Sequence, residues 1–233
     1  MTLDNAVRTA DQKFVGAQPV NPYVAALPPY NAGMSLARAQ HLSGRRDIAR
    51  LASNENPDGC SPAVLAALNG AGFEPWRYAD PACTALRGAL AKRLNVGADS
   101  IVVGNGSEEM IAAISRAVLE PGVQTVTVVP SFGLHEIEPL AAGADVLKVP
   151  MTAAAGFDLR ALQSALAASP RLVFLSSPWN PVGPGLDLPS LRGLIAAVRE
   201  VARRLLHGAP VGAAVVAVDA RDARRCQPPP CQP

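Results

Sequence analysis

Apolar runs alternate with amphipathic stretches over most of the chain, and this alternation predicts the order of its elements. Short apolar runs predict strands at residues 100–104, 123–129, 145–149, 171–176 and 213–218. Apolar residues at helical spacing predict helices at residues 62–70, 81–94, 107–119, 136–142, 158–168 and 189–206. Strands that are apolar throughout and are separated by helices are typical of a mostly parallel sheet with helices on both faces. We therefore expect an α/β fold.

The two ends of the chain differ from this central part. In the first fifty residues prolines and glycines interrupt every run, and only residues 35–42 predict a short helix. After about residue 207 the sequence RDARRCQPPPCQP has no apolar period, which is typical of a disordered tail. The pattern thus predicts an arm at 1–50, a domain at 51–206 and a tail at 207–233.

Composition and charge exclude several classes of protein. The 233 residues are 49% hydrophobic, but no run approaches the ~18 consecutive apolar residues of a membrane-spanning helix. Asp4 and Asp11 stand where a signal peptide needs an apolar block, so we expect a cytoplasmic protein. A net charge of +2 gives no footprint for nucleic acid. Four cysteines without a Cys-x-x-Cys pair favour a reducing compartment over a disulfide scaffold or a zinc site.

The histidines and serines form no recognisable catalytic pattern. His41, His135 and His207 lie in separate regions without the spacing of metal ligands. The sequence has no Gly-x-Ser-x-Gly motif. Metal catalysis and Ser-His-Asp hydrolysis are therefore disfavoured.

A glycine-rich turn, GNGSEE at residues 104–109, joins a predicted strand to a predicted helix. Because the N-terminus of a helix favours an anion, the turn is a candidate phosphate site. The alternative is an ordinary glycine turn capped by Ser107. Glu109 stands where the dinucleotide fingerprint requires its third glycine, which weighs against a doubly wound nucleotide-binding protein and leaves it as a third hypothesis.

Candidate ligand contacts follow two other predicted strands. Asn180 lies in SSPWNPVG, directly after the strand at 171–176, and Phe132 lies in VVPSFG. Open parallel sheets bind ligands beyond the carboxyl ends of their strands, so both positions suit a site. The alternatives are a proline-rich turn and a core aromatic. Two more motifs, NENP at 54–57 and WRY at 76–78, also read simply as a turn and an interface aromatic cluster.

Taken in order, these motifs resemble the fold-type I pyridoxal-phosphate aminotransferases, and within them the histidinol-phosphate aminotransferase group. The resemblance rests on LASNENPDG, WRYADP, IVVGNGSEEMI, VVPSFG and LVFLSSPWNPVG, and it runs from about residue 19 to residue 206. It implies a pyridoxal-phosphate-dependent transferase large domain, with an incomplete small domain to which the arm contributes. It also implies transamination of imidazole-acetol phosphate with glutamate in histidine biosynthesis, and a homodimer.

The resemblance implies a role for each matching residue. Gly106, Ser107 and Glu108 match the turn that holds the phosphate of the cofactor, pyridoxal 5′-phosphate. Phe132 matches the aromatic that stacks on the pyridine ring, and Asn180 matches the asparagine that binds the ring's 3-oxygen. Tyr78 matches a tyrosine that reaches the phosphate in the neighbouring subunit, and Tyr30, Asn54 and Glu55 match segments that close over the phosphorylated substrate.

The sequence also departs from the family pattern. The family's Schiff-base lysine lies well downstream of the asparagine motif, whereas the three lysines here, Lys13, Lys92 and Lys148, all precede Asn180. Asp219, in VVAVDARDA, is the nearest match to the aspartate that binds the pyridine nitrogen. The later arginines and most of the small domain are missing. We therefore expect a truncated or frame-shifted chain, broken near Leu206, that is inactive alone.

Two other functions remain open within this resemblance. The chain could be a non-catalytic aminotransferase remnant that binds the cofactor weakly or pairs with a complete subunit. It could also derive from a threonine-phosphate decarboxylase, whose front half is similar.

Overall fold

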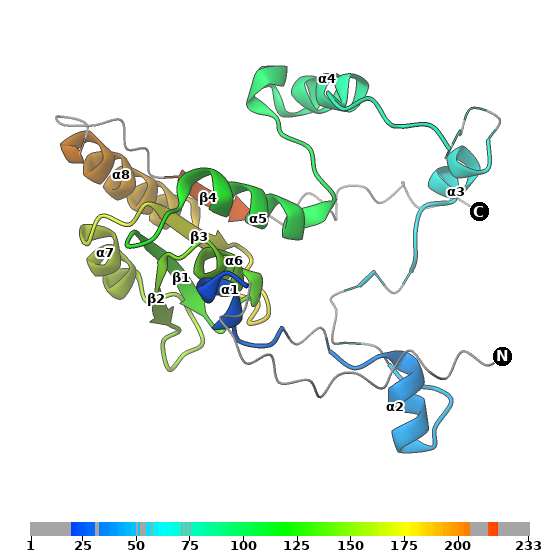
Figure 1. Ribbon diagram of the computed structural model, residues 1–233, viewed down its shortest axis with the longest axis horizontal. Coiled ribbons are helices and arrows are strands. Elements are labelled where there is room, and N and C mark those ends of the chain that lie inside the picture. The colour runs from blue at the N-terminus through cyan, green and yellow to red at the C-terminus, as the bar shows by residue number, and fades with distance from the viewer. Residues whose placement is uncertain are drawn as a thin grey trace. The chain divides into compact units, whose positions relative to one another are not determined.

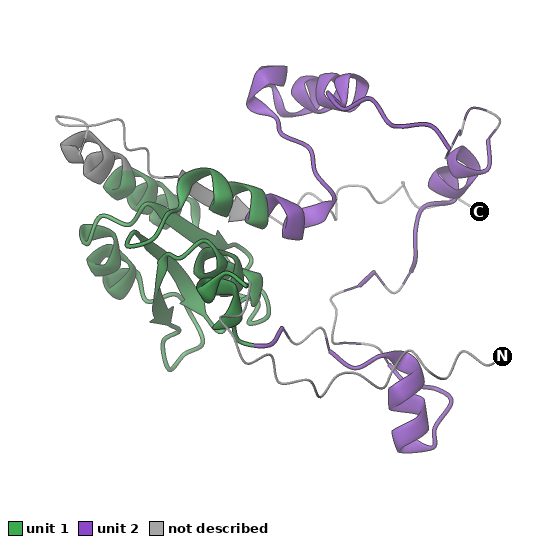
Figure 2. Cartoon of the chain, in the orientation of Figure 1, with its two compact units in different colours: residues 1–28, 112–233 green, residues 29–111 purple. Residues whose placement is uncertain are grey.

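The computed structural model describes residues 20–30, 33–49, 51, 55–56, 58–70, 72, 74, 76–205 and 214–218. The chain divides into two compact units, which Figure 2 distinguishes by colour. Unit 1 comprises residues 1–28 and 112–233, and unit 2 comprises residues 29–111. The division into arm, domain and tail that the sequence suggests stays a prediction.

Unit 1 is built on a parallel sheet. The described strands are β1 (Gln124–Val129), β2 (Asp145–Pro150), β3 (Leu172–Ser176) and β4 (Ala214–Val218). All pairs are parallel, and the spatial order is β2-β1-β3-β4 (Figure 1). β1 and β3 are therefore central strands, and their side chains are almost entirely buried. The predicted α/β fold with a parallel sheet is confirmed.

Helices cover both faces of this sheet. α6 (Leu134–Ala141) lies on one face, and α7 (Leu159–Ala167) and α8 (Leu188–Leu205) pack together on the other (Figure 1). Alternate strand residues point to the α7–α8 face and form its core with residues of the two helices. The fully or nearly fully buried members of this core include Val126, Val128, Val173, Leu175, Leu162, Leu166 and Leu194.

The intervening strand residues point to the α6 face, where the core is more polar. Thr125 and Thr127 of β1 are fully buried there, next in sequence to Val126 and Val128 of the opposite face. Phe174 of β3 stacks on the buried His135 of α6. The Thr125 hydroxyl has no hydrogen-bond partner among the described residues. Burial on this face therefore carries a desolvation cost that the α7–α8 face does not have.

Aspartates fix where α7 and α8 begin. The Asp158 carboxylate accepts a hydrogen bond from the Ala161 N–H at 2.8 Å, and the Asp187 carboxylate accepts one from the Ser190 N–H at 2.7 Å. Hydrogen bonds from the Ser190 side chain and backbone lower the pKa of Asp187. These caps satisfy N–H groups that have no acceptor within the helix, which explains why both helices begin within a residue of the prediction.

The first helix belongs to unit 1 although it lies far from the sheet in sequence. α1 (Pro22–Ala25) follows Asn21, whose side chain accepts the Tyr23 N–H. The Tyr23 ring covers Gly143, at the end of α6, so closely that a Cβ on Gly143 would lie 3.1 Å from two ring carbons. Gly143 also has a φ of +82°, so both space and backbone conformation require glycine.

Unit 2 contains short helices whose side chains are mostly exposed. They are α2 (Leu36–Ser43), α3 (Pro62–Leu68), α4 (Thr84–Leu94), the 3₁₀ turn η2 (Ala98–Ser100) and the start of α5 (Gly106–Val118), which continues into unit 1. α2 and α3 match the prediction, with Ser35 and Ser61 as their N-caps. No helix in the described part of the chain is long and apolar enough to cross a membrane.

In unit 2 the start of one predicted helix and the whole of one predicted strand are wrong. The helix predicted from residue 81 begins at Thr84, because the Asp80 carboxylate accepts the N–H groups of Ala82 and Thr84 and holds residues 81–82 in a turn. The strand predicted at 100–104 does not form. Ile101 has an extended backbone, but no described strand pairs with this segment, and Val102 is 78% exposed.

We predict that the α7–α8 core dominates the stability of unit 1. Leu162 is 1% exposed, so Leu162→Ala should lower the free energy of unfolding by about 2–5 kcal/mol, through lost burial and a residual cavity. Urea denaturation measures this. The neighbouring exposed change, Gln163→Ala, should stay within about 0.5 kcal/mol of the parent. Equal effects of the two substitutions would contradict the assignment of this core.

Candidate functional site

The order of the strands singles out one edge of the sheet. From β1 the chain moves outward to β2, and it then returns to place β3 on the opposite side of β1. In open α/β sheets, ligands bind where the strand order reverses in this way, beyond the carboxyl ends of the two strands. Phe132 follows β1 and Asn180 follows β3. The structure thus brings these two candidate residues to the same edge of the sheet.

The segment after β1 is held by an aromatic stack. The Phe132 ring meets the His135 ring edge to face at 5.9 Å, and the His135 ring stacks on Phe174 of β3 at 5.0 Å with an interplanar angle of 3°. The Phe132 carbonyl accepts the His135 backbone N–H at 2.9 Å. The Phe132 ring therefore packs on the His135 ring, which in turn packs on a side chain of the sheet.

His135 is a buried histidine with a defined partner. Its side chain is 3% exposed, and its Nδ1 lies 3.0 Å from the Ser131 hydroxyl. Burial lowers the pKa of His135 from 6.5 to about 4, so the ring is neutral near pH 7. The sequence interpretation treated the histidines as isolated and did not connect His135 with Phe132. Their spacing of three residues at the start of a predicted helix was the available signal.

The segment after β3 closes on itself. The Ser177 hydroxyl accepts a hydrogen bond from the Leu186 N–H at 2.9 Å. The backbone N–H of Trp179 donates to the Pro184 carbonyl at 2.7 Å, and the Gly183 N–H donates to the Trp179 backbone carbonyl. Gly183 has a φ of +106°, which a residue with a side chain rarely adopts. Asn180 lies within this closed loop with an exposed side chain.

Trp179 joins the two segments, and the sequence interpretation missed it. Its indole Nε1–H donates to the Pro130 carbonyl at 2.6 Å, across 49 residues of sequence. The indole is 1% exposed and packs on Phe157, with ring centroids 4.6 Å apart. A large aromatic with one polar atom, placed beside the candidate asparagine, was the signal in the sequence.

This edge of the sheet carries no formal charge in its two loops. Residues 130–135 and 176–183 contain no Asp, Glu, Lys or Arg, and the histidine among them is neutral near pH 7. The groups that it presents are aromatic faces, hydroxyls, an amide and backbone atoms. Such a set can orient a flat aromatic ligand and hydrogen-bond its edge, but it cannot neutralise an anion.

The N-terminus of α5, in unit 2, has the other candidate chemistry. Gly106 has a φ of +79°, and its N–H donates to the Gly104 carbonyl at 2.9 Å, which makes the tight turn into the helix. The first-turn N–H groups of Ser107 and Glu108 have no acceptor within the helix, so the turn favours an anion. The Glu109 carboxylate already accepts the Asn105 N–H. It supplies one negative charge to this end of the helix from within the chain.

The remaining candidate residues stay predictions. Tyr30, Glu55 and Tyr78 lie in unit 2 with exposed side chains. Asn54 and Asp219 lie outside the described residues. Among the described residues no group of three or more His, Cys, Asp or Glu side chains could hold a metal ion.

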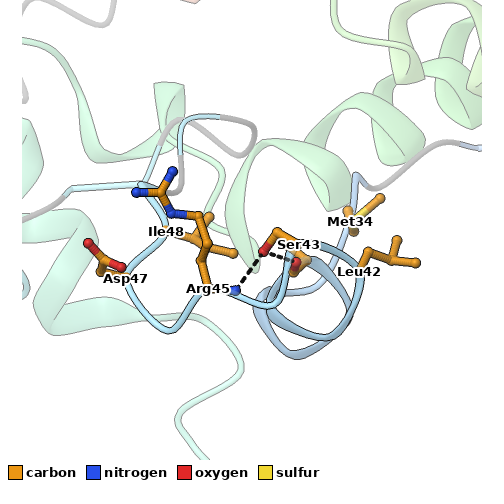
Figure 3. A pocket seen from close by; sticks show the side chains of 7 residues that line it. Met34, Leu42, Ser43, Arg45, Asp47 and Ile48 are labelled. Carbon is orange, nitrogen blue, oxygen red and sulfur yellow. Dashed lines mark hydrogen bonds between the residues drawn. The ribbon is translucent and has the colours of Figure 1, made fainter.

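A shallow pocket of about 510 Å³ lies at the end of α2 in unit 2 (Figure 3). Its lining is mainly apolar and includes Met34, Leu42 and Ile48, together with the charged residues Arg45 and Asp47. Ser43 ties the turn beside it, because its hydroxyl donates to the Ala39 carbonyl at 2.8 Å and accepts the Arg45 N–H at 3.2 Å. The pocket contains none of the candidate ligand-binding residues.

Comparison with known proteins gives a consistent family match. The family model described as aminotransferase class I and II matches residues 46–207. Histidinol-phosphate aminotransferase 1 of Mesorhizobium japonicum is 42% identical over 173 residues, which are 74% of this chain and 47% of that protein. Histidinol-phosphate aminotransferase 3 of Rhizobium meliloti is 36% identical over 184 residues, 79% of this chain and 50% of that protein. The chain thus spans about half the length of the curated relatives it matches.

Solved structures agree with this match. The crystal structure of histidinol-phosphate aminotransferase from Sinorhizobium meliloti in complex with pyridoxal-5′-phosphate matches with a TM-score of 0.72 and 25% identity, over 87% of this chain and 51% of that one. The putative histidinol-phosphate aminotransferase of Erwinia carotovora atroseptica matches with a TM-score of 0.62 and 31% identity, over 72% and 46% of the two chains.

The burial of His135 predicts a pH dependence of stability. Its folded pKa of about 4 lies below the ordinary 6.5, so the unfolded chain takes up the proton first as the pH falls. The free energy of unfolding should therefore fall from about pH 6.5 to pH 4, by up to about 3 kcal/mol from this residue. Urea denaturation at several pH values measures this. His135→Phe should flatten the curve in that window, and an unchanged slope would contradict the assignment.

Proposed function

Because this chain belongs to the aminotransferase class I and II family, we propose that it binds pyridoxal 5′-phosphate at the carboxyl ends of β1 and β3. At the full length of its relatives, the protein exchanges an amino group between glutamate and imidazole-acetol phosphate, in histidine biosynthesis. The substrate assignment is supported by the histidinol-phosphate aminotransferases among its relatives. The cofactor assignment is supported by the pyridoxal-5′-phosphate complex of the similar Sinorhizobium meliloti enzyme.

The observation that carries the proposal is the pair of joined loops at the sheet edge. An aromatic ring backed by His135 and Phe174 lies in one loop, and an exposed asparagine lies in the other. The indole of Trp179 connects the two loops by its hydrogen bond to Pro130. A flat heteroaromatic ring with a polar edge fits this set of groups, because it needs one stacking face and one amide partner.

The phosphate requires a separate group of donors. We assign it to Gly106, Ser107 and Glu108 at the N-terminus of α5, where helix N–H groups favour an anion. The Glu109 carboxylate accepts the hydrogen bond of the Asn105 N–H. The phosphate is therefore bound by the N–H groups after Asn105 and by the Ser107 hydroxyl.

Each residue then has a defined task. Phe132 orients the ring by stacking, and the Asn180 amide donates a hydrogen bond to the 3-oxygen, which favours the deprotonated oxygen. The Asp219 carboxylate accepts a hydrogen bond from the protonated pyridine nitrogen and keeps that nitrogen protonated. Tyr78 reaches the phosphate of a neighbouring subunit in a homodimer. When bound, pyridoxal 5′-phosphate supplies the electron sink for bond cleavage at the substrate's Cα.

Three further residues belong to the substrate side. Tyr30, Asn54 and Glu55 close over the phosphorylated amino or keto substrate. They lie in two short segments that precede the sheet in the sequence.

Covalent attachment needs a lysine that these residues do not provide in a suitable place. Lys148 lies on β2 and forms an ion pair with Glu136 of α6, while Lys92 is exposed near the end of α4. Lys13 lies outside the described residues. We assign the attachment lysine to the half of the relatives' length that this chain does not span. Residues 1–233 alone then bind the cofactor without catalysing turnover.

We predict phosphate-dependent binding of the cofactor to the purified chain. Pyridoxamine 5′-phosphate is the probe, because it has no aldehyde that could react with surface lysines. It should bind at least about tenfold more tightly than pyridoxamine in calorimetric titration, since charge-assisted hydrogen bonds contribute about 1.5–3 kcal/mol. Ser107→Ala should weaken binding about tenfold, and the exposed Ser164→Ala on α7 should not. Equal affinity for the two probes would contradict the proposal.

The location of binding can be tested with the chain's own fluorescence. The sequence has two tryptophans, and Trp76 is 74% exposed whereas Trp179 is 1% exposed. In a Trp76→Phe variant the emission comes from Trp179 alone, next to Asn180. Pyridoxamine 5′-phosphate should quench this emission with the same midpoint as in the calorimetric titration. Asn180→Ala should shift that midpoint about tenfold, and a midpoint that does not shift would place the ligand elsewhere.

Catalysis separates the proposed activity from its alternatives. We predict no glutamate formation above the cofactor-only background when the chain is mixed with pyridoxal 5′-phosphate, histidinol phosphate and 2-oxoglutarate. A version extended to the length of its relatives should catalyse the reaction, and Asn180→Ala in that version should lower kcat/KM by roughly tenfold or more. Release of carbon dioxide from threonine phosphate instead would favour the decarboxylase.

A further inference from the structure

The backbone pairing of β1 and β3 does not extend to the carboxyl ends of these two strands. Their ladder joins Thr125 to Leu172, Val126 to Val173 and Thr127 to Phe174. β1 continues to Val129 and β3 continues to Ser176, so the ladder stops two residues before either strand ends. Backbone pairing therefore does not set the distance between the loops that carry Phe132 and Asn180.

A side chain bridges the strands beyond that point. The Trp179 Nε1–H donates to the Pro130 carbonyl at 2.6 Å, and this carbonyl lies two residues before Phe132. Trp179 is also the residue immediately before Asn180. The hydrogen bond therefore joins the two loops within two residues of each proposed ring contact.

The indole is itself fixed, so the bridge can transmit position. Its ring packs on Phe157, from the connection between β2 and α7, at a centroid distance of 4.6 Å. Its backbone N–H and carbonyl are bonded to Pro184 and Gly183, within the closed loop. With 1% of the side chain exposed, water competes little for the indole N–H.

We propose that Trp179 is a positioning residue of the cofactor site: its bond to Pro130 sets the separation of Phe132 and Asn180 and holds both loops still before the ligand arrives. This assignment rests on the proposed function. It adds that orientation depends on one indole N–H that touches neither cofactor nor substrate. A displacement of the order of 1 Å at such a site costs up to about a hundredfold in rate.

The decisive variant removes the N–H and keeps the shape of the ring. Replacing Trp179 by 3-benzothienylalanine puts sulfur in place of the N–H group. Loop order is measured first, in the free chain, by ¹⁵N relaxation at Phe132 and Asn180. Order parameters near the rigid value of about 0.85 in the parent should fall towards about 0.6 in the variant. If both residues stay rigid, the proposal is overturned, whatever the ligand result.

Ligand affinity provides the second measurement. The variant should bind pyridoxamine 5′-phosphate about tenfold more weakly than the parent, with a melting temperature within a few degrees of it. Leu194→Ala, in the same core and 3% exposed, is the matched control. It should lower the melting temperature but leave the affinity within about twofold at temperatures well below melting. Unchanged affinity in the benzothienyl variant overturns the inference.

The two proposals fail in different ways. If the parent shows no phosphate-dependent binding, the proposed function fails, and the relaxation data on the free chain still decide whether Trp179 holds the loops. If the parent binds and the benzothienyl variant binds equally well, the proposed function stands and the role of Trp179 is rejected. Trp179→Phe, which removes the N–H and part of the ring, should weaken binding at least as much as the benzothienyl variant.

Discussion

Strands β1 and β3 pair at the centre of the sheet and separate before either one ends. The pairing is necessary because both strands are buried on both faces, where an unpaired backbone group costs free energy. The end of the ladder is equally important, because β1–β3 ladder hydrogen bonds do not join the loops at the point where the strand order reverses. The loops beyond that point must then be fixed by side chains, and Trp179 and the Phe132–His135–Phe174 stack do this from opposite sides.

The two faces of the sheet divide the work between stability and positioning. The α7–α8 face is apolar throughout its core and accounts for most of the hydrophobic burial. On the α6 face the strand residues Thr125 and Thr127 alternate with that core, and the Thr125 hydroxyl lacks a partner among the described residues. His135 is buried on this face in its neutral form. A purely apolar α6 face would stabilise the fold more, but it would lose the Ser131–His135 hydrogen bond that orients the ring under Phe132.

The sequence predicted most of the helices and strands but few of the contacts that make the site. Continuous apolar runs identified the buried strands, because β1 and β3 have no solvent-facing side, and apolar residues at helical spacing identified most of the helices. The strand predicted at 100–104 does not form, because hydrophobicity alone does not show whether a partner strand is present to pair with it. Asn180 and Phe132 could be proposed from their place after strands. The indole bond from Trp179 to Pro130 spans 49 residues, and no local pattern encodes a contact of that range. The burial of His135 likewise depends on Phe174, which is distant in sequence.

The absence of charge in the two loops constrains how an anionic ligand can be bound. Residues 130–135 and 176–183 provide aromatic faces, hydroxyls and an amide, so they can orient a ligand but contribute no charge. For a phosphorylated ligand, the attraction must come from other segments, of which the N-terminus of α5 is the described example. In that helix the Glu109 carboxylate accepts the Asn105 N–H, so this N–H of the turn has a hydrogen-bond acceptor before any ligand is present. The proposed function therefore assigns charge recognition and ring orientation to different segments of the chain. Loss of orientation should reduce catalysis more than it reduces binding, whereas loss of the helix contact should reduce both to a similar extent.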